Sequence, residues 1–298
     1  MSCNATKTAR RITKRLLVAA LLLISAAACV PVPPGGGPGP TTGGSTGPTA
    51  GGGAGGQAAK PGHVFVINLE NKGYNEVWGA DSRATYLSQT LRSQGVLLSQ
   101  YYGIAHNSNP NYLAQISGQA SNAMTRRDCP TYAAFRQTGT AALGQVEGTG
   151  CVYPESVPTV AGQLSAAGKT WKAYMEDMGT SCRHPELGAK DGSQGAKVGD
   201  EYATRHNPFV YFESITSSPD CKSNVVDYAE LAGDLRSVET TPNLSYISPN
   251  LCNDGHDNPC VDGSPGGSDG SRQLAEPANP GDPGLPGFQA GRDAGHHL

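Results

Sequence analysis

Between residues 63 and 247 the sequence alternates between short apolar runs and segments in which apolar residues have helical spacing. Runs of strand length are residues 63–69, 95–102, 169–174 and 243–247. Helical spacing occurs in residues 86–93, in 111–116 with a stop at Gly118, and in 159–167 and 227–238. This order predicts an α/β domain with a largely parallel central sheet and helices on its faces.

Composition limits the size and class of the domain. The chain has 298 residues with a net charge of −3, so it lacks the excess of basic residues that is typical of nucleic-acid-binding proteins. Most of the 40 glycines and 22 prolines lie in residues 31–62 and 262–298. The globular part is therefore about 200 residues, which is the size of one domain. No apolar run of about 20 residues follows the N-terminus, which excludes a multispan membrane protein.

Residues 1–29 have the order of an export signal. Basic residues precede an apolar run over residues 16–30, and small residues lie just before Cys29. This arrangement predicts export to the cell surface, the periplasm or the medium. A cysteine in this position is also typical of a bacterial lipoprotein, in which Cys29 would be lipidated and attach the chain to a membrane; plain cleavage is the alternative. Residues 30–61 are rich in Gly, Pro and Thr and are interpreted as a flexible linker.

The cysteines agree with an exported protein. Six of the eight lie beyond the signal, and none of them has the C-x-x-C spacing of a zinc site. Six cysteines allow 15 pairings. We expect sequential pairing, because it closes the shortest loops: Cys129 with Cys151, Cys182 with Cys221, and Cys252 with Cys260.

Polar side chains follow three of the predicted strands, at the ends where α/β domains carry their sites. Glu70 and Asn71 follow the first strand, residues 106–111 follow the second, and residues 248–257 follow the last. Carboxylate and amide oxygens suit a hard cation, a hydroxyl at a helix start suits a nucleophile, and a histidine beside aspartates suits a proton donor. Each feature also has a structural interpretation as a turn, a helix cap or a solvated loop.

Four segments together resemble the bacterial phosphoesterase family, which contains phospholipases C and acid phosphatases and belongs to the alkaline phosphatase superfamily. They are VFVINLENKGYNEVWG (64–79), HNSNPNYLAQISG (106–118), RHNPFVYF (205–212) and TPNLSYISPNLCNDGHDNPC (241–260). The resemblance covers about residues 63–267. It implies a three-layer alkaline-phosphatase-like domain and hydrolysis of phosphate esters through a covalent phosphoenzyme.

The resemblance also implies roles for individual residues. Ser108 is similar to the family nucleophile, and His256 to the histidine that helps the leaving group. His206 and Asp257 are the expected substrate-binding residues, and Glu176 is expected to be structural or to lie at the rim. The implied ligands of a divalent metal cation of unknown identity are Glu70, Asn71, Ser108 and Asp254.

The family pattern continues beyond Gly267 through a helix and a buried strand that ends in two acidic residues, whereas residues 268–298 have no such apolar run. We therefore expect the phosphoesterase domain, residues 62–267, to be incomplete at its C-terminus. A reading-frame shift between about Gly267 and Pro286 would explain this, and a natural disordered tail is the alternative. An under-coordinated metal would leave the chain with weak or no activity. A non-catalytic exported module that binds phosphate ligands or surface polymers is the competing function.

Overall fold

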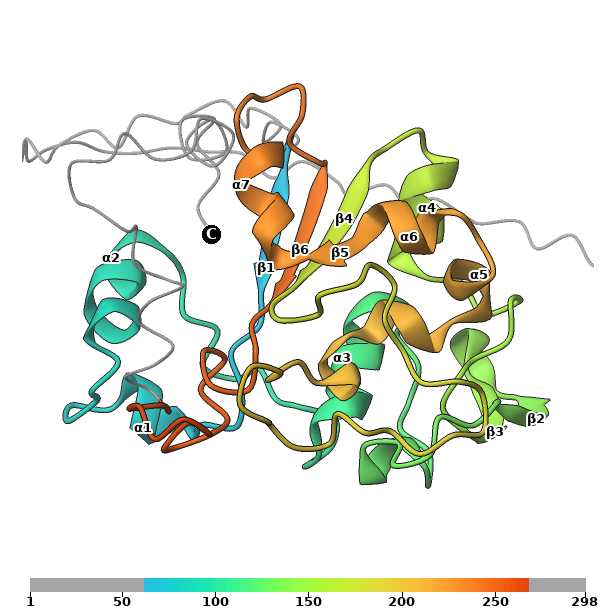
Figure 1. Ribbon diagram of the computed structural model, residues 1–298, viewed down its shortest axis with the longest axis horizontal. Coiled ribbons are helices and arrows are strands. Elements are labelled where there is room, and N and C mark those ends of the chain that lie inside the picture. Colours follow the sequence, from blue (N-terminus) through green and yellow to red (C-terminus); the bar gives the residue numbers. More distant parts are fainter. Residues whose placement is uncertain (1–61, 268–298) are drawn as a thin grey trace, which may run out of the picture. The chain divides into compact units, whose positions relative to one another are not determined.

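The computed structural model describes residues 62–267 (Figure 1). The predictions made for the signal (1–29), the linker (30–61) and the tail (268–298) lie outside the described residues. Within residues 62–267, no helix is long and apolar enough to cross a membrane.

A four-stranded sheet forms the centre of the domain. Its order is β1 (Val64–Ile67), β6 (Leu244–Ser248), β4 (Trp171–Met175) and β5 (Val225–Asp227), and every neighbouring pair is parallel. Leu244 is opposite both Val64 and Trp171, so β6 is hydrogen-bonded along both of its edges. The predicted α/β class with a parallel sheet is confirmed.

The remaining elements are short. The α-helices are α1 (Tyr74–Trp78), α2 (Arg92–Gln94), α3 (Ser108–Ser117), α4 (Val160–Ala166), α5 (Glu213–Thr216), α6 (Asp220–Asn224) and α7 (Leu231–Asp234). A π-helix (Tyr86–Leu91) leads into α2, and 3₁₀ helices form at Thr125–Arg127, Ala142–Gly144, Thr204–His206, Pro208–Tyr211 and Tyr228–Glu230. The antiparallel strands β2 (Arg136–Thr140) and β3 (Val146–Thr149) form a separate hairpin.

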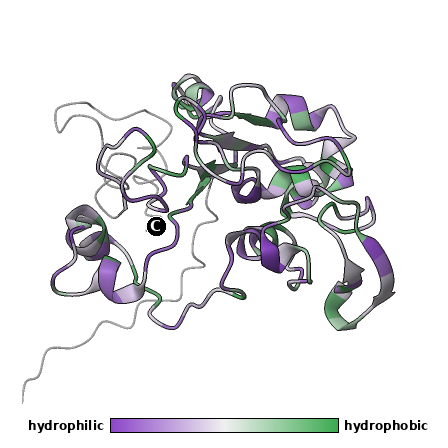
Figure 2. Ribbon diagram, turned by 60° about the horizontal axis from the view of Figure 1, so that its bottom comes forward, coloured by the Kyte–Doolittle hydropathy of each residue, from purple (hydrophilic) through white to green (hydrophobic). Residues whose placement is uncertain are grey.

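Successive strand residues point to opposite faces of the sheet, which gives the domain two cores. On β4, Ala173 and Met175 belong to the larger core with α3 and α4, whereas Tyr174 belongs to a smaller core with α7. The same alternation separates Tyr246 from Ile247 on β6. Every residue of β6 and four of the five in β4 are buried, as expected for a sheet that is covered on both faces. Figure 2 shows green hydrophobic residues among white and purple ones along the elements of the domain. The result is a three-layer arrangement.

Three disulfides close loops around this core. They join Cys129 to Cys151, Cys182 to Cys221, and Cys252 to Cys260. The expected sequential pairing is confirmed. Disulfides of this kind are typical of exported proteins.

The prediction of a strand at residues 95–102 is wrong. Residues 97–102 form turns and coil, and four apolar side chains stay largely exposed, Val96 at 78%, Tyr101 at 75%, Tyr102 at 72% and Leu98 at 66%. A run of apolar residues favours a strand only where a neighbouring strand and a core receive it, and this segment pairs with no strand of the described chain.

Other predicted boundaries differ by a few residues. The helix predicted at 111–116 begins earlier, at Ser108, and ends at Gly118, whose φ of 68° is the left-handed conformation that glycine adopts readily. The helix predicted at 227–238 is a 3₁₀ turn followed by the short α7. The β2–β3 hairpin and β5 were not predicted.

The packing of the larger core indicates which side-chain truncation should destabilise the fold most. Phe209 is fully buried, stacks on Trp171 at 5.2 Å between ring centroids and meets Tyr246 edge-on at 5.1 Å. We expect Phe209→Ala to lower the free energy of unfolding by about 3–5 kcal/mol, because it leaves a cavity between two rings. Leu143→Ala is the control, since Leu143 is 99% exposed, and should change it by less than about 0.5 kcal/mol. Urea unfolding of both variants measures the difference. Equal losses of stability in the two variants would contradict the central position of Phe209 in the larger core.

Candidate functional site

The carboxyl ends of the parallel strands bring polar segments together at one edge of the sheet. Glu70 follows β1, Glu176 follows β4, and the loop 250–257 follows β6. Backbone hydrogen bonds join these segments: the Glu70 N–H donates to the carbonyl of Asp254 at 2.7 Å, and the Glu176 N–H donates to that of Ser248 at 3.0 Å. The polar segments after β1 and β6 lie together, as predicted, because the two strands are parallel.

Ser108 is the first residue of α3, and a carboxylate from outside the helix holds the residues on either side of it. Asp128 accepts hydrogen bonds from the backbone N–H of Asn109 and from the side-chain amide of Asn107, both at 2.9 Å. Asn107 is the N-cap, but its own side chain makes no capping bond. Asp128 therefore supplies the capping that the helix start lacks.

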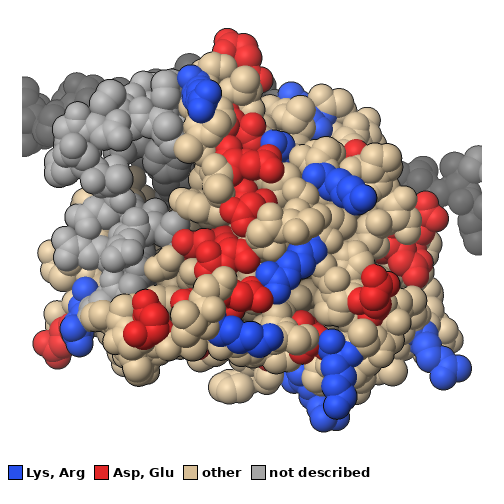
Figure 3. Space-filling view, viewed as in Figure 1, with Lys and Arg blue, Asp and Glu red and all other residues tan. Residues whose placement is uncertain are grey.

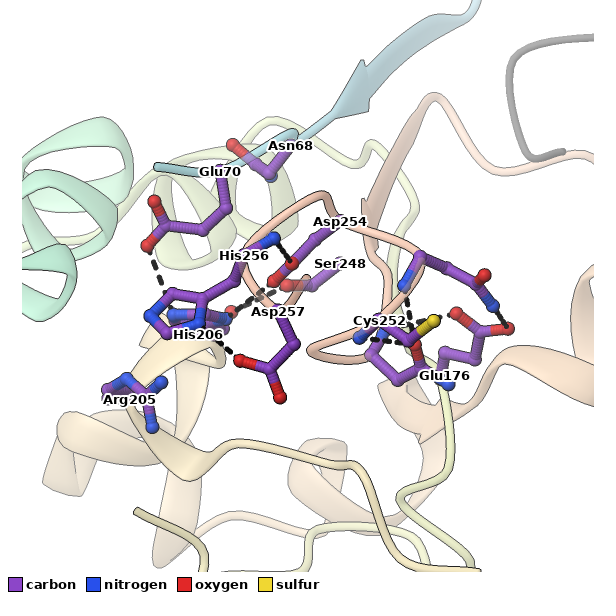
Figure 4. Close-up of polar contacts among 12 residues, drawn as sticks. Asn68, Glu70, Glu176, Arg205, His206, Ser248, Cys252, Asp254, His256 and Asp257 are labelled. Atoms are coloured by element: carbon purple, nitrogen blue, oxygen red, sulfur yellow. Dashed lines mark hydrogen bonds and ion pairs between the residues drawn. The ribbon is translucent and has the colours of Figure 1, made fainter. Parts of the chain in front are cut away.

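His206 lies between two carboxylates. Its Nε2 is 3.1 Å from Oε1 of Glu70, and its Nδ1 is 3.0 Å from Oδ2 of Asp254 (Figure 4). These contacts are ion pairs by distance, and their angles are not those of well-directed hydrogen bonds. The ring is 2% exposed and stacks on Tyr112 of α3 at 4.9 Å between centroids. His206 thus connects β1, α3 and the β6 loop.

The charges of this group shift its protonation equilibria. Burial acts to raise the pKa of Glu70, but the contact with His206, a hydrogen bond from the Ser108 hydroxyl and the nearby histidine charges lower it to about 2. Burial and the charge of Arg205 act to lower the pKa of His206, but Asp254 and Glu70 raise it above its usual value. Glu70, His206 and Asp254 therefore form a connected polar group, and Ser108 affects it through the pKa of Glu70.

His256 and Asp257 form the accessible part of the site. Nδ1 of His256 is 2.7 Å from Oδ1 of Asp257, and both side chains are somewhat more than a quarter exposed. The rings of His256 and His206 have centroids 6.0 Å apart. The backbone N–H of His256 donates to Oδ1 of Asp254 at 2.7 Å, which fixes the start of this turn.

Glu176 fastens the loop that carries these residues. It accepts hydrogen bonds from the backbone N–H of Asn250 at 2.9 Å and from the side chain of Asn253 at 2.8 Å. The neighbouring Asp177 accepts from the Asn250 side chain at 2.8 Å. Burial raises the pKa of Glu176. Its structural role agrees with one of the two roles expected from the sequence.

The edge of the sheet is acidic. Burial raises the pKa of Glu201, and the charges of Asp177, Asp262, Asp257 and Glu176 raise it further. Figure 3 shows Asp and Glu side chains gathered in a band across this face. An anionic ligand that enters here therefore requires compensating positive groups.

The metal site expected from the sequence stays a prediction. Ser108 lowers the pKa of Glu70, and the oxygens of both side chains suit a hard cation. Asp254 faces His206 instead, and Asn71 is exposed, with a φ of 53°. Among residues 62–267, no group of three or more histidines, cysteines or carboxylates could hold a metal ion. Divalent cations need about four to eight ligands, so we assign no catalytic step to a metal.

Comparison with known proteins gives the family. The phosphoesterase family matches residues 80–266, which is more than half of the chain. The chain belongs to the phosphoesterase family. Its relatives include a probable acid phosphatase of Kluyveromyces lactis, 26% identical over 196 residues, and an acid phosphatase of Aspergillus fumigatus, 26% identical over 193 residues. Each match covers 65% of this chain.

A phosphatidylinositol-3-phosphatase of Mycobacterium tuberculosis is 24% identical over 201 residues, or 67% of this chain. The matched segment spans only 38% of the Kluyveromyces protein, 36% of the Aspergillus protein and 54% of the mycobacterial one. Membership of the phosphoesterase family is confirmed, and the named relatives are fungal acid phosphatases and a mycobacterial phosphatase. The phospholipase C type, the superfamily and the C-terminal truncation stay predictions.

Most of the predicted site residues lie together in this phosphoesterase domain. Glu70 and Asp254 flank His206, and His256 with Asp257 lies beside them. Ser108 lowers the pKa of Glu70. Asn71 points to solvent and makes no hydrogen bond with the described residues. Sequence reasoning missed Asp128 and Tyr112, because their roles depend on contacts between segments that are distant in the chain. The one local indication of a role for Asp128 is its position directly before a cysteine that forms a disulfide.

The capping contact predicts the effect of removing Asp128. Asp128→Ala should lower the free energy of unfolding by about 0.5–2 kcal/mol, since it leaves the Asn109 N–H and the Asn107 amide without their acceptor. Asp81→Ala removes an exposed carboxylate and serves as the control, with a change below about 0.5 kcal/mol. Urea unfolding at pH 7 compares them, and an Asp128 variant as stable as the control would show that the cap is unimportant.

Proposed function

We propose that this chain hydrolyses phosphate esters through a phosphoserine formed on Ser108. The observation that carries the proposal is the group of Glu70, His206 and Asp254, which packs on α3 through Tyr112 in a phosphoesterase domain. Ser108, at the start of that helix, lowers the pKa of Glu70. Because the named relatives act as acid phosphatases or on a phosphoinositide phosphate, we propose phosphate monoesters as the substrate class, with a phospholipase C type of reaction on diesters as the alternative.

The proposed reaction has two displacements. In the first, Oγ of Ser108 forms a bond to phosphorus as the bond from phosphorus to the leaving oxygen breaks. Protonated His256 gives its proton to that oxygen, and the serine proton leaves to solvent. In the second, water attacks the phosphoserine, His256 takes a proton from that water, and the serine oxygen regains a proton from solvent. The products are an alcohol and hydrogen phosphate.

Glu70 orients Ser108 in this scheme. A carboxylate whose pKa is about 2 is too weak a base to take the serine proton near neutral pH, but it can hold the hydroxyl in one rotamer. Asp257 plays the same part for His256, because its contact with Nδ1 leaves Nε2 as the nitrogen available to the leaving group.

The role of Ser108 is tested by hydrolysis of p-nitrophenyl phosphate, with bis(p-nitrophenyl) phosphate as the diester comparison. We expect Ser108→Ala to remove turnover of the monoester, by at least about 10³-fold where the rate permits, while inorganic phosphate still binds. Ser99→Ala changes an exposed serine outside the site and is the control. If the Ser108 variant and the unmodified chain have equal rates, the proposal fails and the non-catalytic binding module is favoured.

A divalent cation remains a proposal for this site. Among residues 62–267, no group of three or more histidines, cysteines or carboxylates could hold a metal ion, so we expect the chain to turn over slowly. The same assay, run with EDTA and with Mg²⁺, Mn²⁺, Ca²⁺ or Zn²⁺, should give rates below those of the fungal acid phosphatases in every case. A metal-stimulated rate equal to theirs would contradict this expectation.

We also propose that the chain is exported and attached to a membrane through lipidated Cys29. The three disulfides support export. In a bacterial host, labelled palmitate should be incorporated into the full chain and lost in Cys29→Ser, whereas Cys3→Ser should keep the label. Incorporation that is unaffected by Cys29→Ser would exclude this attachment.

A further inference from the structure

Arg205 is a buried cation without an anionic partner. It is 4% exposed and is the one lysine or arginine in the buried class among residues 62–267. Its Nη1 donates to the carbonyl of Gln194 at 2.9 Å, and Nε and Nη2 meet no acceptor in the described chain. None of the described carboxylates lies within ion-pair distance of it. A cation this far removed from water is normally paired with an anion. Nε and Nη2 are not among the fully buried atoms without a partner, so both keep some access to solvent.

The nearest polar network does not supply that partner. The Asp191 carboxylate accepts from the Ser193 N–H and hydroxyl, the Thr204 hydroxyl and the Gln194 amide. The Asp128 carboxylate holds the start of α3. Both carboxylates are therefore engaged with other donors, and the guanidinium keeps two donor nitrogens for a ligand.

Arg205 lies at the site described above. It belongs to the 3₁₀ helix Thr204–His206, and its carbonyl accepts a hydrogen bond from the buried Asn109 side chain at 3.3 Å, one residue beyond Ser108. Figure 4 places its side chain beside His206, on the side away from Glu176. The guanidinium is linked to the residue that holds the start of α3, because the side chain of Gln194, whose carbonyl accepts from Nη1, donates to the carbonyl of Asp128 at 3.0 Å.

The start of α3 offers a phosphate few backbone donors. The N–H of Asn109 already donates to Asp128, and Pro110 has no N–H. Few backbone N–H groups at the start of α3 are therefore left to bind an anion, as the N-terminus of a helix commonly does. Positive side chains must supply the compensating charge instead, in an environment rich in carboxylates.

We propose that Arg205 binds the phosphoryl group of the substrate and determines affinity for phosphate monoesters. A planar guanidinium can give two parallel hydrogen bonds to phosphate oxygens. This inference rests on the proposed function, because it places the phosphate at Ser108.

Equilibrium binding of inorganic phosphate to the full chain, measured by calorimetry at low salt, tests the proposal without requiring turnover. We expect Arg205→Gln to weaken phosphate binding at least tenfold and Arg205→Lys to weaken it less, since lysine keeps the charge but loses the paired donors. Arg183→Gln removes an equal charge from a partly exposed arginine that is paired with Asp200, and it should bind like the unmodified chain.

Three results would overturn the proposal: no phosphate binding by the unmodified chain, unchanged binding by Arg205→Gln, or an equal loss in Arg183→Gln. Circular dichroism and disulfide mapping establish that each variant is folded. If Arg205→Gln does not fold, phosphate should still protect Arg205 of the unmodified chain from phenylglyoxal, as read by mass spectrometry, and absence of protection refutes the assignment. A chain that binds phosphate through Arg205 but hydrolyses nothing would refute the proposed hydrolysis and leave this inference standing.

Discussion

The hydrogen bonding of β6 along both edges is the constraint on which the site depends. Because β1, β6 and β4 are parallel, the segments that follow them emerge at one edge of the sheet. Glu70 and Asp254 are far apart in sequence, but pairing of the strands leaves their loops close enough for a backbone hydrogen bond of 2.7 Å. The position of the carboxylates therefore follows from backbone pairing.

Strand pairing brings two carboxylates close together, and His206 lies between them. Two carboxylates that are largely removed from water repel each other, and an imidazolium between them relieves the repulsion. Stacking on Tyr112 fixes the plane of the ring and links it to the helix that begins at Ser108. The same side chain thus stabilises the fold and orders the site, so any change at His206 affects both.

The sequence predicted the parts of the fold that depend on local pattern. The apolar runs of β1 and β6, the stop at Gly118 and the disulfide pairing needed only composition, conformational preference and loop length. The segment 95–102 has the same apolar character but remains largely exposed, because strand formation also requires a partner. The positions of Asp128 and Arg205 depend on packing between distant segments, and no periodic pattern indicates them.

Covalent cross-links lie beside both halves of the site. Asp128, which holds the start of α3, directly precedes Cys129 of the disulfide to Cys151, and Asp254, His256 and Asp257 lie within the loop closed by Cys252 and Cys260. Glu176 and the Glu70 N–H attach that loop to the strand ends. Short elements with little regular structure can hold side chains in fixed positions when their loops are closed in this way. The geometry of the candidate site therefore depends on the disulfides as well as on the sheet.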